Sequence, residues 1–185
     1  EVYGKRCVLT NVSLDLSDPE LATIARHVLP RLAEVHVRET VSLAAHAAII
    51  GGVAPQLYPD PGWAAQPRPP EQWAALARLA GHFSAWPDVA EGFDPSEPYL
   101  TLGASSAFSN DQAAIRVAIP AFIELARRLR QRVPQVLLTA SCEVDAAIMR
   151  TVAARTGLPL LGLNVPVVQA IDVLANSRLH VGGRW

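Results

Sequence analysis

The amino-acid sequence predicts an α/β protein built from two Rossmann-like domains, each with a parallel sheet. Short apolar segments alternate with amphipathic ones along most of the chain, which is the order of strands and helices in parallel sheets. Hydrophobic residues make up 50% and charged residues 18% of the 185 residues, which favours a sizeable core and excludes intrinsic disorder. The alternation is interrupted once, where prolines and tryptophans cluster between Pro59 and Pro98. We therefore expect two domains joined by a connection, with right-handed crossovers and helices on both faces of each sheet.

The first domain, expected over residues 1–62, contains two strand–helix pairs and a third, short strand. Asp18 followed by Pro19 is typical of a helix start, because an N-cap acceptor precedes a residue with a preset φ. Either Thr40 or Ser42 is expected to cap the second helix. The predicted strands span residues 6–12, 34–38 and 53–58, and the predicted helices span residues 19–32 and, from residue 40 or 42, up to 50.

The connection is expected over residues 63–98 and the second domain over residues 99–185. Within the connection, only residues 70–80 have a helical pattern. The second domain resumes the alternation of strand and helix, with Gly157 expected to end one of its helices. Its predicted strands span residues 99–103, 135–139, 160–163 and 179–182, and its predicted helices span residues 111–132, 143–156 and 167–176.

Composition excludes several classes of function. A net charge of -1 provides no global field for nucleic acid or for an anionic membrane surface. The two cysteines are far apart in sequence and are expected to stay reduced, and no Cys or His pair has the spacing of a zinc site. The apolar stretches are too short for a transmembrane helix, and neither a GxGxxG nor a P-loop pattern occurs. We expect no cofactor and no metal.

Ligands of open parallel sheets bind beyond the carboxyl ends of the strands, which directs attention to the residues that follow each strand. His36 and Arg38 share one face of the strand at residues 34–38, opposite Val35 and Val37. A sheet covered on both faces would hold apolar side chains there. His36 is either functional or a satisfied core residue, and Arg38 either binds a ligand or forms an ion pair with Glu39 or Asp60.

The loop at residues 103–110 supplies the hydroxyls of Ser105, Ser106 and Ser109 just before a long helix. Backbone N–H groups at a helix start suit an anion, although serines there also serve as simple caps and turn residues. For His180, in the last predicted strand, a structural role is favoured.

Three segments, at residues 36–42, 57–62 and 177–185, together resemble the polysaccharide pyruvyl transferase family. They read HVRETVS, LYPDPG and SRLHVGGRW, and their order and separations agree with that family over nearly the whole chain. The family's glycine- and asparagine-rich first βα turn does not precede Val8, and the histidine expected after Arg184 would lie beyond Trp185. Arg178 and His180 also read as R-x-H, but the strand and glycines that follow them favour Arg184. The resemblance thus implies a fragment, with the first domain incomplete at its N-terminus and the second at its C-terminus.

The resemblance also implies a function and its residues. The reaction would transfer the pyruvyl group of phosphoenolpyruvate to two hydroxyls of a sugar in a cell-envelope or extracellular polysaccharide, on a fold like that of B-type glycosyltransferases. Arg38 and Arg184 would hold the donor, which would lie between the two domains, and His36 is a secondary candidate for the general acid. We expect a bacterial, cytoplasmic enzyme that acts on a glycan or lipid-linked sugar acceptor. Self-association is expected because an incomplete sheet exposes an edge.

Two alternatives remain at this stage. A glycosyltransferase or epimerase that uses a nucleotide sugar could share the same fold. A non-catalytic fragment could instead bind a glycan or protein partner through Trp63, Trp73 and Trp86.

Overall fold

The computed structural model describes residues 5–52, 54–79, 82, 92–105 and 111–182, and it shows a mixed α/β chain. The chain divides into two compact units, Glu1–Ala65 and Gln66–Trp185. Each unit contains a three-stranded parallel sheet, with strand order β1-β2-β3 in the first and β5-β4-β6 in the second. Arg184, Ser106 and Ser109, all predicted site residues, lie outside the described residues.

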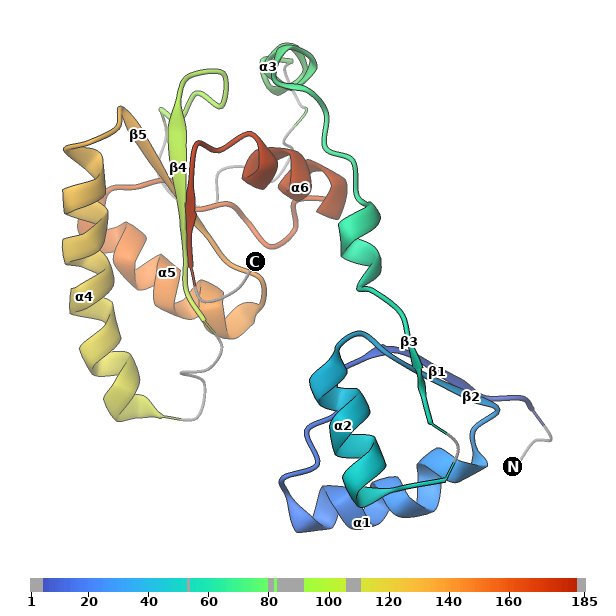
Figure 1. The fold of residues 1–185 in the computed structure, drawn as a ribbon. Helices are drawn as coiled ribbons and strands as arrows, with labels where there is room; N and C mark the ends of the chain where they lie inside the picture. The colour runs from blue at the N-terminus through green and yellow to red at the C-terminus, as the bar shows by residue number, and fades with distance from the viewer. Residues whose placement is uncertain (1–4, 53, 80–81, 83–91, 106–110, 183–185) are drawn as a thin grey trace. The chain divides into compact units, whose positions relative to one another are not determined.

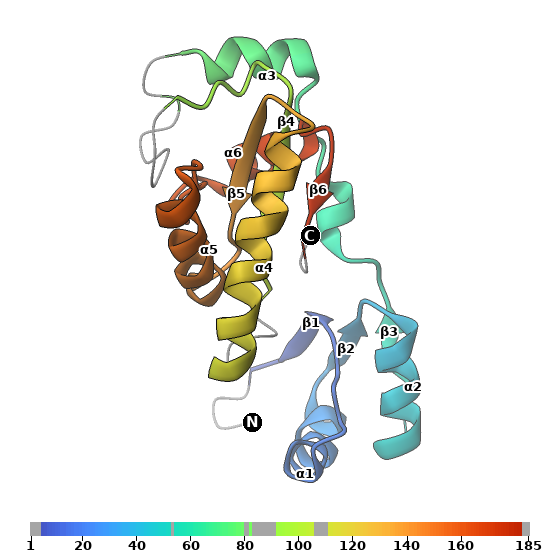
Figure 2. The same cartoon turned by 90° about the vertical axis from the view of Figure 1, so that its left-hand side faces the viewer.

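The first unit carries its two helices on one side of the sheet (Figures 1 and 2). The strands follow one another in the order β1-β2-β3, and successive right-handed crossovers in one direction place every helix on the same face. For this unit the expectation of helices on both faces was therefore wrong. The elements are β1 Val8–Val12, α1 Pro19–Val28, the 3₁₀ turn η1 Leu29–Arg31, β2 Glu34–Val37, α2 Thr40–Ile49, β3 Gln56–Leu57 and the 3₁₀ turn η2 Pro61–Ala64.

One-sided cover explains why the central strand β2 alternates polar and apolar residues. Val37 is completely buried on the helix side, whereas Glu34 and His36 lie on the opposite face and are only partly buried. No helix in the described part of this unit covers that face. His36 and Arg38 therefore follow the ordinary pattern of a sheet with one open face.

Local chemistry sets the starts of both helices. The Asp18 carboxylate accepts the N–H groups of Glu20 and Leu21 at 2.7 and 3.3 Å, which confirms the predicted cap of α1. The prediction that Thr40 or Ser42 caps α2 was wrong. Glu39 takes the N-cap position of α2. Its side chain accepts no backbone N–H of the helix, because its carboxylate instead accepts the hydroxyl of Ser42.

The second unit matches the sequence prediction most closely. The predicted ranges of β4, β5 and α5 are confirmed to the residue, and Gly157 ends α5 in the left-handed conformation. The predicted strand at residues 160–163 is reduced to a single bridge between Leu160 and Leu138. The elements are α3 Pro70–Ala77, β4 Tyr99–Gly103, α4 Gln112–Arg130, β5 Gln135–Thr139, α5 Glu143–Thr156, α6 Val167–Ala175 and β6 His180–Val181.

In this unit helices cover both faces of the sheet (Figure 1). One core cluster joins Leu102 and Val136 of the strands to α4 and α5, and the other joins Tyr99 and Leu137 to Trp73 of α3 and Val173 of α6. The Tyr99 hydroxyl donates to the Val173 carbonyl at 2.5 Å, and burial raises the pKa of this phenol. The proline-rich segment ahead of α3 is attached through Arg68, whose N–H and guanidinium both bond to the buried carboxylate of Asp172.

Within the part of the chain that the structure describes, no helix is both long and apolar enough to cross a membrane.

Trp73 should contribute far more to stability than Trp63. Trp73 is 2% exposed in the core of the second unit, whereas Trp63 is 76% exposed. Trp73→Ala should destabilise the second unit by about 3–5 kcal/mol, and Trp63→Ala should change stability by less than about 0.5 kcal/mol. Urea unfolding followed by far-UV circular dichroism measures both. Equal losses in the two variants would contradict the core described above.

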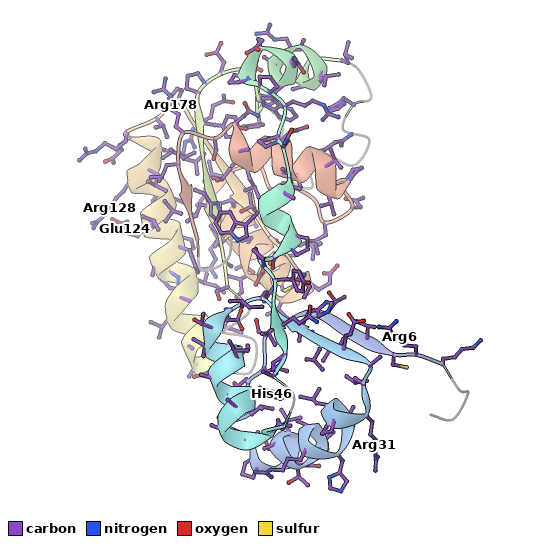
Figure 3. All side chains as sticks on the ribbon, turned by 45° about the vertical axis from the view of Figure 1, so that its right-hand side comes forward. Arg6, Arg31, His46, Glu124, Arg128 and Arg178 are labelled. Carbon is purple, nitrogen blue, oxygen red and sulfur yellow. The ribbon has the colours of Figure 1, made fainter. Side chains whose placement is uncertain are left out.

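Stability should fall at acidic pH because of His46. This side chain is buried on α2 (Figure 3), and burial lowers its pKa below the ordinary value of 6.5. The unfolded chain therefore binds the His46 proton first, so stability is lost as pH falls through 6.5 toward the lower pKa of the folded state. In urea unfolding between about pH 7.5 and 5.5, His46→Gln should lose less stability than the unaltered chain. His27→Gln, at an exposed position, is the control and should leave the pH dependence unchanged.

Candidate functional site

The carboxyl ends of all three strands of the first unit meet at the guanidinium of Arg38. Arg38 follows β2, and its Nε donates to the hydroxyl of Ser13, which follows β1, at 2.8 Å. Its Nη1 donates to Asp60 Oδ2, beyond β3, at 2.7 Å, and Glu39 Oε2 lies 3.5 Å from Nε. Arg38 thus forms both of the ion pairs that the sequence suggested.

Ser42 supports this arrangement from the first turn of α2. Its hydroxyl donates to the Glu39 carboxylate and accepts the backbone N–H of Leu14 at 2.7 Å, and the residue is 1% exposed. Glu39 Oε2 also accepts the Ser13 hydroxyl at 3.0 Å. We call the five residues Ser13, Arg38, Glu39, Ser42 and Asp60 the Arg38 cluster. Its hydrogen bonds fix the plane of the guanidinium before any ligand arrives.

Both carboxylates of the Arg38 cluster are held in the ionised form. The Ser42 hydroxyl is the main cause of the lowered pKa of Glu39. The Gly62 N–H, 2.9 Å from Asp60 Oδ1, is the main cause of the lowered pKa of Asp60, followed by Arg38. The Arg38 guanidinium is bonded to Asp60 and lies close to Glu39, so these two carboxylates compete with an incoming anion for it. The side chain of Arg38 is 40% exposed, and among the described residues Nη2 has no partner.

His36 lies on the open face of the first sheet. Its Nε2 is 3.1 Å from Glu34 Oε2, and its ring packs against Tyr58 with centroids 4.8 Å apart. Opposite His36, β1 has a bulge between Leu9 and Val12, in which Asn11 takes a φ of 56°. Bulges of this kind are frequent beside functional sites and redirect neighbouring side chains.

At the second sheet, polar residues gather around Gly103 at the carboxyl end of β4. A Cβ at Gly103 would lie 3.0 Å from Thr139 Oγ1 and 3.2 Å from His180 Cε1, so a larger residue here would require these two side chains to shift. Ser105, a predicted anion-binding residue, follows two positions later and is half-buried. The start of α5 is fixed by Asp145, which is buried and accepts both the N–H and the hydroxyl of Ser141.

Two hollows of the described surface lie away from the carboxyl ends of both sheets. A pocket of about 310 Å³ lies at the opposite, amino-terminal ends of β2 and β3 and is lined in part by His46, Val35 and Gly51. An apolar hollow of about 590 Å³ lies on α4, along Ala114, Val117 and Phe122. The described residues contain no group of three His, Cys, Asp or Glu side chains that could hold a metal.

The sequence pattern did not single out Ser13, and for His180 it favoured a structural role. Ser13 follows directly after β1, and applying the strand-end rule to the first strand as well would have found it. His180 could be recognised only from its pairing with Thr101, a residue 79 positions away.

Neither a protein-family model, nor a curated protein, nor a solved structure matches this chain.

Proposed function

We propose that this chain belongs to an enzyme that transfers the pyruvyl group of phosphoenolpyruvate to a sugar of a cell-envelope or extracellular polysaccharide. The observation that supports this proposal is the fixed guanidinium of Arg38, on which three strand ends converge. The two units would then be Rossmann-like domains of a fold like that of B-type glycosyltransferases. We place the reaction in the cytoplasm, and we expect the enzyme to self-associate.

The donor carries two anionic groups, a carboxylate and a phosphate, and a planar guanidinium binds either through two parallel hydrogen bonds. In the proposed complex Arg38 offers Nη2 and exchanges its bond to Asp60 for a bond to the donor. Because Asp60 still accepts the N–H of Gly62, the turn that carries it keeps its shape during this exchange. Arg184, Ser105, Ser106 and Ser109 are proposed to bind the remaining charge of the donor.

The proposed reaction begins at the methylene carbon of phosphoenolpyruvate. A proton adds to the methylene carbon of phosphoenolpyruvate, and the oxygen of one sugar hydroxyl bonds to the neighbouring carbon. Phosphate then leaves with its bonding electron pair, and the oxygen of a second hydroxyl forms the cyclic ketal. Of the two hydroxyl protons, one ends on the new methyl group and the other on phosphate. His36, beside Glu34, is a candidate for delivering the first proton.

Phosphoenolpyruvate should bind to the chain through Arg38. In calorimetric titrations, Arg38→Ala should bind phosphoenolpyruvate at least about tenfold more weakly than the unaltered chain, since a charge-assisted hydrogen bond is lost. Arg128→Ala is the matched control, because Arg128 lies on the exposed side of α4, where it pairs with Glu124 (Figure 3). If the unaltered chain binds phosphoenolpyruvate no better than a nucleoside diphosphate, the donor assignment is wrong.

Removing the charge of Asp60 should strengthen donor binding. Asp60→Asn keeps an oxygen that can accept the N–H of Gly62, but it removes the carboxylate that competes with the donor for Arg38. We expect several-fold tighter binding of phosphoenolpyruvate in the same titration, with unchanged thermal stability of the first unit. Weaker binding in this variant would mean that Asp60 orients Arg38 for the donor and does not compete with it.

A further inference from the structure

The pocket at the amino-terminal ends of β2 and β3 contains a buried histidine. Its volume is about 310 Å³, and it is bounded by the starts of these two strands, by η1 and by the last turn of α2. His46, on that last turn, lines the pocket and is 4% exposed (Figure 3). A pocket of this volume is at the lower end of the range that small organic ligands occupy.

The imidazole of His46 has no hydrogen-bond partner among the described residues. Burial alone lowers the pKa of His46, and no ion pair or hydrogen bond opposes it. The ring is therefore neutral at about pH 7, and it carries one N–H donor and one nitrogen lone pair. Buried polar groups are nearly always hydrogen-bonded, because an unpaired one costs free energy. A partner from outside the chain, bound in the pocket, would supply the missing hydrogen bond.

The other side chains around the pocket indicate what that partner is made of. Glu34 already bonds to Arg6 and to His36. Gln56 accepts the hydroxyl of Tyr58 at 2.9 Å. A negative charge at Glu34 disfavours an anion in the pocket, and apolar walls favour an apolar molecule. Apart from Glu34, Gln56 and His46, the described lining consists of glycines and apolar side chains, among them Leu29, Leu32, Val35 and Ile50.

Two glycines leave space on the α2 side of the pocket. Gly51 and Gly52 follow α2 with φ angles of 69° and 73°, the left-handed region that favours glycine. A Cβ at either position would have no described atom within 4 Å. The backbone conformation thus disfavours larger residues at two positions where a side chain could have closed the pocket.

We propose that this pocket binds a small uncharged organic molecule that has an apolar body and one hydroxyl group, which hydrogen-bonds to the ring of His46. A hydroxyl both donates and accepts, so it can pair with either nitrogen of the neutral ring. The site is separate from the one proposed for the donor. Arg38 follows the other end of β2, four residues and about 13 Å along the strand from Glu34.

Binding is tested by NMR of the histidine rings in the full chain at about pH 7.5, with phenol as the probe. Phenol should shift the ring signals of His46 in a saturable way and leave those of His27, exposed on α1, unchanged. Benzene lacks the hydroxyl and should bind several-fold more weakly. Benzoate should bind at least about tenfold more weakly, because its charge would have to leave water. If phenol does not shift His46, or if benzoate binds as tightly as phenol, the proposal is wrong.

Two variants show whether phenol binds in this pocket. His46→Phe keeps a ring without its nitrogens and should abolish the preference for phenol over benzene, followed through the backbone amide signals of α2. Ala54→Leu leaves His46 in place, fills part of the pocket and should weaken phenol binding several-fold. Ala48→Leu, exposed on α2 and outside the lining, is the matched control and should bind phenol as the unaltered chain does. Unchanged affinity for phenol in both His46→Phe and Ala54→Leu would place the probe elsewhere, for example in the hollow on α4, and would overturn the proposal.

Discussion

The parallel direction of the strands, combined with right-handed crossovers, is the constraint on which the rest of the structure depends. It brings every carboxyl end of a sheet to one edge, so that Ser13, Arg38 and Asp60 meet although 47 positions separate the first from the last. The same constraint puts both helices of the first unit on one face. In the second unit, β4 lies between β5 and β6, and helices cover both faces.

The edges at which the carboxyl ends of the strands lie differ between the two sheets in charge and in hydrogen bonding. In the first unit the Arg38 guanidinium already pairs with the carboxylates of Glu39 and Asp60, and these would compete with an anionic ligand. In the second unit neutral hydroxyls and an imidazole surround a glycine, which suits groups that donate and accept hydrogen bonds.

The sequence predicted most of the elements because their ends carry local signals. The β4, β5 and α5 ranges were confirmed, since apolar runs end at glycines or polar turns there. The prediction of a strand at residues 160–163 was wrong. An apolar run in the sequence indicates that a segment is buried, but it does not show whether the segment pairs with a neighbouring strand. Arg38 and its ion-pair partners Glu39 and Asp60 could be predicted from the sequence, because all three follow the ends of predicted strands. The Ser42 support, the bulge at Asn11 and the link between Thr101 and His180 depend on register between distant segments, which no local pattern contains.

The bond between Arg68 and Asp172 has a consequence for how the chain can be divided. Asp172 is buried on α6, and its charge is compensated by a residue that comes before α3 in a run of prolines. A protease cut, or an engineered gene start, placed after Arg68 would leave this carboxylate in the interior without its counter-ion, at a high cost in folding free energy. The shortest stable form of the second unit therefore includes residues that belong, by composition alone, to a linker.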